Sequence, residues 1–331
     1  MILDERPWIS TLLTTLLGAL ALLGCQAKSS APADAADTST PPLTTAMAVD
    51  APTSSELANA TYEGLYDQPV TLADGGWEGE PYEPGAASRP TVGLVKHFWM
   101  SGDLDGDGTE EAVVLLWESG GGSGTENYVA AMGRRDGELV NLGTALMGDR
   151  VQLKEARIAD GKIELDVVQA GPEDAMCCPS QKATRVWALG SDGLDEVASE
   201  VTGTLSIEDL AGPEWVLTHL NWDEPAPAEP EVIMVYEEGR LAGTSGCNRY
   251  FASVESGEMV GDLIVGPAAG TRMACPEELM ALEDHYLAQL GEVSGFGFLA
   301  GKLGLSWSTD DSSGVMLFQP REQPAEESPA D

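Results

Sequence analysis

The sequence predicts a mainly β protein with minor α-helix, built as two small antiparallel β domains. Short apolar runs alternate with turn signals, and Ile163, Leu165 and Val167 fall on one face of a segment with period two, which is typical of a half-buried strand. Asp-Gly pairs at 136–137 and 160–161 suit tight hairpin turns, because these turns require positive φ. Since no internal repeat is present, a propeller or solenoid is not expected.

A length of 331 residues exceeds one typical core, so we expect two domains with linkers. The first linker and the C-terminal tail are rich in Ala, Ser, Thr, Pro and acidic residues and have no apolar periodicity, which favours disorder. The expected parts are a signal peptide (1–24), a disordered tether (25–57), a β-rich domain (58–200), a second β domain (205–319) and a disordered tail (320–331).

The charge balance is strongly acidic. The chain has 55 Asp and Glu against 17 Lys and Arg, a formal net charge of −38. Such a surface repels phosphate backbones and anionic lipid headgroups, so we expect no nucleic-acid partner and no electrostatic binding to a membrane. A solvated surface is the simpler interpretation, and a surface that attracts cations is the alternative.

An uncharged apolar segment at residues 8–24 predicts export. Its seventeen residues are fewer than the roughly 20 that a membrane-spanning helix needs, and suit the core of a signal peptide. Leu22-Leu23-Gly24-Cys25 resembles the bacterial lipobox, which implies cleavage before Cys25 and acylation of its thiol by chains such as palmitate. The protein is then lipid-anchored in the cell envelope, and Gln26 suits an outer-membrane position facing the periplasm in a Gram-negative cell. An uncleaved anchor is the alternative, favoured by acidic residues near the amino terminus.

Residues 102–111 carry the sharpest motif of the middle region. Carboxylates occupy positions 1, 3, 5 and 9 of the run 103–111, and glycine occupies position 6; the four candidate ligands are Asp103, Asp105, Asp107 and Glu111. Oxygen ligands at this spacing suit Ca²⁺, and glycine permits the chain to turn sharply around the ion. The loop resembles the Asp-rich loops between strands of integrin-type repeats, so we expect a structural Ca²⁺. The alternative is an Asp/Gly-rich turn without an ion.

The five cysteines leave several pairings open. If Cys25 carries lipid, four remain in an oxidising compartment, and three connectivities are possible. Cys247 and Cys275 would close a loop of 29 residues, counting both cysteines. Cys177 and Cys178 would then form a vicinal disulfide, remain thiols with a redox or metal role, or crosslink to another chain.

Two further segments carry a family resemblance. Residues 246–250, Gly-Cys-Asn-Arg-Tyr, and residues 271–276, Thr-Arg-Met-Ala-Cys-Pro, resemble the paired signatures of the META/HslJ family. Between Pro276 and Gly291, apolar residues at helical spacing predict one helix, for which Pro276 suits the first position. The resemblance implies a compact β-barrel-like fold with this helix packed on it, and a disulfide between Cys247 and Cys275. It also implies a role in stress response, novobiocin resistance or motility, without established catalysis.

The two motifs also contain the candidate residues for binding a partner. Arg249 and Arg272 are two of only 17 basic residues, and with Asn248 they could form an anion or partner site. The simpler interpretation places Asn248 in a turn and pairs both arginines with neighbouring carboxylates.

We find no catalytic motif. None of the three histidines, His97, His219 and His285, stands in a catalytic motif. The glycine-rich residues 120–125 lack the Lys-Ser/Thr ending of a phosphate-binding loop, so we expect a hairpin loop there. We therefore expect a non-catalytic envelope lipoprotein that binds a protein partner or supports stress tolerance. A small-molecule or lipid binder that uses the interior of the C-terminal barrel is the alternative, and a hydrolase is a third hypothesis. A core filled by Trp, Phe and Leu would favour the first over the second.

Overall fold

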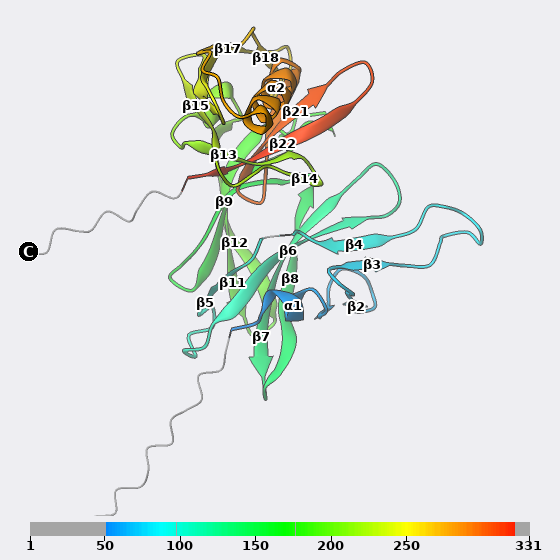
Figure 1. Cartoon of the computed structure of the whole chain (residues 1–331). Coiled ribbons are helices and arrows are strands. Elements are labelled where there is room, and N and C mark those ends of the chain that lie inside the picture. Colours follow the sequence, from blue (N-terminus) through cyan, green and yellow to red (C-terminus); the bar gives the residue numbers. More distant parts are fainter. Residues whose placement is uncertain (1–50, 97, 176, 322–331) are drawn as a thin grey trace, which may run out of the picture. The chain divides into compact units, whose positions relative to one another are not determined.

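The computed structural model describes residues 51–96, 98–175 and 177–321, all within one compact unit, residues 47–331 (Figure 1). The expected signal peptide, Cys25, most of the expected tether and residues 322–331 lie outside the described residues. In the described part, no helix is both long enough and apolar enough to cross a membrane.

The N-terminal part of the unit is antiparallel β-structure, with one sheet of two strands and one of six in the order β3-β4-β6-β7-β8, where β5 pairs with β6. A single helical turn, α1 (Ser54–Leu57), precedes them. The strands are β1 (Thr61–Tyr62), β2 (Val70–Thr71), β3 (Gly76–Glu78), β4 (Thr91–Leu94), β5 (Met100–Gly102), β6 (Glu111–Ser119), β7 (Glu126–Arg135) and β8 (Glu138–Asp149).

A four-stranded antiparallel sheet follows, in the order β12-β11-β10-β9. Its strands are β9 (Gln152–Ala159), β10 (Lys162–Gln169), β11 (Gln181–Gly190) and β12 (Gly193–Thr204). The β9–β10 turn has Asp160 at φ 50° and Gly161 at φ 70°, and Asp136 and Gly137 have the same conformation between β7 and β8, as their sequence predicts. Buried side chains of this sheet and of the preceding one share a core around Trp187.

The C-terminal part is a nearly closed, barrel-shaped antiparallel sheet with one helix packed against it, which confirms the predicted fold class. Its main order is β18-β17-β16-β15-β13-β22-β21-β20, and a bridge between Asp262 and Gly295 brings the ends of this order together. A 3₁₀ turn, η1 (Ile207–Leu210), leads into it. The strands are β13 (Trp215–Asn221), β14 (Glu224–Pro225), β15 (Val232–Glu237), β16 (Arg240–Ser245), β17 (Arg249–Ser256), β18 (Leu263–Val265), β19 (Ala269–Gly270), β20 (Val293–Leu299), β21 (Lys302–Ser308) and β22 (Ser313–Pro320).

The helix α2 (Glu277–Gly291) buries one face against this sheet (Figure 1). Leu282, Tyr286 and Leu290 are buried, as the helical spacing predicts, and join Trp215 and Phe318 in the core of the C-terminal domain. Pro276 is the N-cap instead of the first helical residue, and Gly291 lies inside the helix.

The folded structure extends beyond the expected linker boundaries at both ends. Residues 54–57, expected in the tether, form α1, where Thr53 and Glu56 make a reciprocal capping box and Leu57 is buried. At the other end Pro320, expected in the tail, belongs to β22, and Arg321 forms ion pairs with Glu214 (2.7 Å) and Glu231 (2.8 Å).

Strand β9 joins the four-stranded sheet to the C-terminal domain. The Gln152 side chain accepts a hydrogen bond from the Phe298 N–H (2.9 Å), and the Leu153 carbonyl accepts one from Gly301 (3.1 Å). The Lys154 ammonium group bonds Asp209 of η1 at 2.5 Å. The two hydrogen bonds fix the end of β20 and its turn relative to β9, and the ion pair connects β9 to η1.

Candidate functional site

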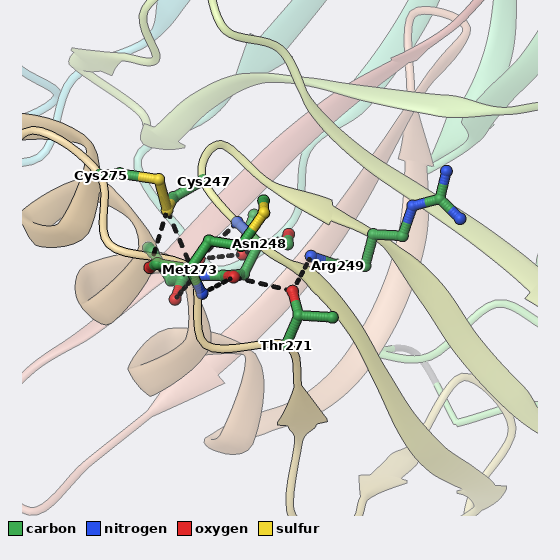
Figure 2. Close-up of a disulfide and its surroundings, with 8 residues drawn as sticks. Cys247, Asn248, Arg249, Thr271, Met273 and Cys275 are labelled. Carbon is green, nitrogen blue, oxygen red and sulfur yellow. Dashed lines mark hydrogen bonds between the residues drawn. A yellow bond between two sulfur atoms is a disulfide. The ribbon is translucent and has the colours of Figure 1, made fainter.

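Cys247 and Cys275 form a disulfide, with their Cα atoms 6.1 Å apart, as the resemblance implies (Figure 2). Cys247 lies in the tight turn between β16 and β17, where Gly246 has φ 96°, a conformation that favours glycine. Cys275 lies just before α2. The bridge therefore joins the turn to the start of the helix.

The β16–β17 turn, the disulfide and the segment before α2 form a region called the disulfide corner here. Asn248 connects its parts through hydrogen bonds to Thr271, Met273 and Glu283. Its Oδ1 accepts bonds from the Thr271 hydroxyl (2.7 Å) and the Met273 N–H (2.8 Å) (Figure 2). Its own N–H donates to Glu283 Oε2 (2.9 Å) and its Nδ2 donates to Glu283 Oε1 (3.1 Å). Since Asn248 is only 5% exposed, it is a buried structural link and not a surface residue that could contact a partner.

Ser245 and Glu283 complete the corner. The buried Ser245 hydroxyl lies 2.6 Å from Glu283 Oε2 and 2.9 Å from the Asn248 carbonyl, so its single proton serves one of the two contacts at a time. Glu283 thus accepts bonds from several groups of the β16–β17 turn and attaches α2 to it. A carboxylate satisfied in this way is a fixed structural acceptor.

Arg249 and Arg272 border one surface pocket of about 350 Å³ beside this corner. Both side chains are exposed, and that of Arg249 extends away from the disulfide (Figure 2). Within the described residues neither forms an ion pair, whereas most other lysines and arginines there do. The expectation that both arginines pair with neighbouring carboxylates is therefore wrong. The two arginines and the buried Asn248 thus line the same pocket.

The acidic loop between β5 and β6 gathers three of its four predicted ligands. Oxygens of Asp103, Asp105 and Glu111 lie within 4.8 Å of one another. Glu111 is fully buried; its Oε2 accepts a bond from the Leu104 N–H (2.9 Å), while its Oε1 has no hydrogen-bond partner within the described residues. Two oxygen ligands of one Ca²⁺ lie at most about 5 Å apart. The spacing of the oxygens of Asp103, Asp105 and Glu111 therefore fits that ion.

Asp107 lies outside the group, contrary to the sequence-based ligand set. Its Oδ1 accepts bonds from the N–H (2.8 Å) and the hydroxyl (2.5 Å) of Thr109, and these bonds lower its pKa. Burial raises the pKa of Glu111, and the charges of the neighbouring aspartates add to that effect. Arg135 neutralises part of the cluster through its 2.9 Å ion pair with Asp105.

Cys177 and Cys178 form a vicinal disulfide in the loop between β10 and β11, the first of the alternatives that the sequence left open. Asp174 closes this loop by accepting bonds from the Gly171 N–H, the Ser180 N–H and the Ser180 hydroxyl, each at 2.7 Å. These bonds lower the pKa of Asp174. Cys177 is exposed, so the bridge is open to reductants.

Two of the three histidines lie within the described residues. His219 Nδ1 contacts the Thr218 hydroxyl at 3.0 Å. His285, on α2, lies 3.7 Å from a carboxylate oxygen of Glu224 and contacts the Gln289 amide at 3.1 Å. His97 and Cys25 lie outside the described residues.

Comparison with known proteins identifies the C-terminal part. No curated protein and no solved structure matches the chain. A family model described as META domain matches residues 208–323, which include most of η1, the barrel-shaped sheet, α2 and the disulfide corner. The C-terminal third of this chain therefore matches the META domain, as its two motifs predict.

Proposed function

We propose that this protein is a non-catalytic, lipid-anchored component of the bacterial cell envelope whose META domain binds an acidic segment of an envelope protein. The observation that carries the proposal is the pocket bordered by Arg249 and Arg272, which pair with no carboxylate in the described residues. Guanidinium groups bind carboxylates with two parallel hydrogen bonds, so an acidic side chain or a chain terminus suits the pocket.

The rigidity of the corner supports binding at this place. The disulfide, Asn248 and Glu283 hold the β16–β17 turn and the segment before α2 in fixed positions. Arg249 directly follows the β16–β17 turn, and Arg272 lies within the segment before α2. A preorganised pocket loses less conformational entropy on binding than a mobile one, which favours recognition.

The filled core of the META domain favours a protein partner over a small ligand inside the barrel. Trp215, Phe298 and Phe318 are buried there with many leucines. Large side chains thus occupy the interior that a lipid or a small molecule would need. Binding at the surface is the remaining use of this domain that the geometry supports.

Affinity capture tests the proposal. The acylated full-length chain would be captured from crosslinked envelopes as wild type, as the Arg249→Ala/Arg272→Ala double variant and as Arg240→Ala. Arg240 is a suitable control because it is an exposed META-domain arginine, without an ion pair in the described residues, that borders a different pocket. We expect a reproducible partner with the wild type and the control and none with the double variant.

The same experiment can contradict the proposal. If the double variant retains the partner, the arginine pocket is not the binding surface. If no variant captures any protein, the META domain has no stable envelope partner under those conditions, and the interaction role fails.

Envelope anchoring rests on the lipobox-like sequence ending at Cys25. Replacing Cys25 by Ala should move the protein from the membrane fraction to the soluble fraction, since a single acylated thiol provides the attachment. An unchanged membrane fraction, or a mature protein without acyl mass, would exclude the lipid anchor.

As a second role we propose that the β5–β6 loop binds a structural Ca²⁺ through Asp103, Asp105 and Glu111. The unpartnered, buried Oε1 of Glu111 supports this, because a buried carboxylate oxygen without a partner carries a desolvation cost that a cation would offset. Calcium at about 100 times its dissociation constant would add about 2.7 kcal/mol to the free energy of unfolding.

Thermal unfolding in calcium and in chelator tests this role. We expect calcium to raise the melting temperature of the wild type, Asp105→Asn to abolish the rise, and Asp107→Asn to retain it because Asp107 lies outside the group. Equal melting temperatures of the wild type in both buffers would exclude the site.

A further inference from the structure

A second pocket, separate from the arginine pocket, has an unusual lining for so acidic a chain. It has a volume of about 280 Å³ and is bordered by Trp117, Trp222, Lys96 and Lys302. Leu94 and Leu317 are among the apolar side chains that also border it. None of the described residues that line it is Asp or Glu, although the chain contains 55 of them.

The two indoles are large, partly exposed apolar surfaces at fixed places. Trp117 is 36% exposed and Trp222 is 53% exposed. Trp117 in β6 lies opposite Gly93 in β4, where a Cβ atom would come within 2.4 Å of the indole, so its ring packs directly on the glycine backbone. The backbone of Trp222 is held in the β13–β14 turn, where the backbone N–H of Trp222 donates to Asn221 Oδ1 at 2.9 Å.

The two lysines supply positive charge to the pocket. Within the described residues neither Lys96 nor Lys302 forms an ion pair, although most lysines and arginines there do. Lys302 begins β21 directly after the turn at Ala300 and Gly301, and the Gly301 N–H bonds β9. Its backbone position is therefore fixed, while the long side chain remains free to reach a ligand.

We propose that this pocket binds a small organic anion that carries a flat apolar ring system. Its carboxylate or similar group would lie between the Lys96 and Lys302 ammonium groups, and its rings would pack on the indoles and the leucines. Charge complementarity supports the anion, because two ammonium groups and no carboxylate are among the described residues that line this pocket. The largely apolar lining supports a ring system over a sugar, which would need many hydrogen-bonding groups.

Titration calorimetry with two probes of equal shape tests the charge requirement. The probes are 2-naphthoate and its neutral counterpart 2-naphthylmethanol, added to the acylated full-length chain in detergent, with protein-free micelles as the blank. We expect 2-naphthoate to bind the wild type at least tenfold more tightly than 2-naphthylmethanol does. Lys96→Met/Lys302→Met should make the two affinities equal, because methionine keeps the apolar stem and removes the charge.

Three further variants complete the test. Lys162→Met removes an exposed lysine that also lacks an ion pair in the described residues but lies outside the pocket, and should keep the preference for naphthoate. Trp222→Ala should weaken both probes by a similar factor. Arg249→Ala/Arg272→Ala should leave naphthoate binding unchanged, so this test is independent of the partner-binding proposal.

Several results would overturn the inference. The absence of naphthoate binding to the wild type at about millimolar concentration, where even a weak site is detected, would show that no such site exists. Equal affinity of the wild type for both probes, or an unchanged preference in the double lysine variant, would show that the lysines do not bind the anionic group. A circular dichroism spectrum that matches the wild type would confirm that each variant is folded.

Discussion

The side-chain oxygen of Asn248 accepts a hydrogen bond from the backbone N–H of Met273 at 2.8 Å, so the two META motifs are bonded to each other directly beside the disulfide. The corner is thus held both by a covalent bond and by a buried amide. These two connections contribute in different ways: the disulfide restricts the unfolded chain, whereas the amide stabilises the folded one.

Removing the Cys247–Cys275 bridge should lower the free energy of unfolding by about 3–4 kcal/mol, because it closes a long loop and restricts the unfolded chain. Urea unfolding of Cys247→Ser/Cys275→Ser against the wild type measures this cost. Cys177→Ser/Cys178→Ser is the matched control: its cysteines are adjacent, so almost no loop entropy is involved and we expect little change. A larger loss in the control than in the first variant would contradict this account.

Asn248→Ala should cost about 3 kcal/mol, because it leaves several buried polar groups without partners at about 1–3 kcal/mol each. Among them are the Met273 N–H and one oxygen of Glu283. Thr244→Ala is the control, since the Thr244 hydroxyl makes one bond of 3.2 Å at the surface and should cost under about 1 kcal/mol. Equal losses of free energy of unfolding in the two variants would mean that the amide is not a structural link.

The sequence predicts those strands whose side chains alternate between core and solvent. Ile163, Leu165 and Val167 are all buried in β10, and the Asp-Gly pairs stand in the turns where they were expected. Strand β12 escaped prediction because almost all of its side chains beyond Leu194 are exposed, so its sequence has no apolar period. Its strand conformation comes from hairpin pairing with β11, which an apolar pattern within β12 does not reveal.

For the candidate sites too, the sequence predicts features set by local spacing and misses those that depend on the folded structure. The spacing of acidic residues located the β5–β6 loop, but burial separates Glu111 from Asp107, and burial depends on the folded sheet. The pocket with Lys96 and Lys302 could not be found from sequence, because its walls come from segments about 200 residues apart. The sequence does show that basic residues are scarce in this chain. A lysine or arginine without an ion pair in the structure is therefore a candidate for binding an anion.

Glu111→Gln should separate the effects of charge and of metal at the acidic loop. Burial raises the pKa of Glu111, so the folded state favours the neutral form of this carboxyl group. The resulting stabilisation of the folded state is complete below about pH 4.3, the pKa in the unfolded chain. It is lost as pH rises through the pKa in the folded chain. At pH 7 without metal, the Gln variant should therefore be at least as stable as the wild type. In calcium it should gain nothing, whereas the wild type is stabilised.

Glu110→Gln is the control for this prediction, because Glu110 is exposed and bonds only the Ser101 hydroxyl in the described residues. It should retain the calcium-dependent rise in melting temperature. If Glu111→Gln also retains the rise, Glu111 is not a ligand. If it melts far below the metal-free wild type at pH 7, the buried charge is stabilised by a group other than a cation.

Asp209 gives a pH-dependent test of the junction between β9, β11 and η1. Its side chain is 5% exposed and bonds Lys154 (2.5 Å) and Lys182 (2.8 Å). Burial alone would raise the pKa of Asp209, but the bonds from the two ammonium groups outweigh burial and hold the pKa below its ordinary value. Asp209→Asn should lower the free energy of unfolding at pH 7 by about 1.5–3 kcal/mol, the range for hydrogen bonds to charged groups.

The sign of the pH dependence follows from the lowered pKa. The stabilisation by Asp209 is complete above about pH 3.9, its unfolded pKa, and is lost as pH falls through the folded pKa. The difference in free energy of unfolding between wild type and Asp209→Asn should thus be constant from pH 5 to 7 and shrink below about pH 4. Asp195→Asn on the exposed part of β12 should show little difference at any pH. A wild-type advantage over Asp209→Asn that grows on acidification would mean that the lysines do not stabilise the Asp209 carboxylate.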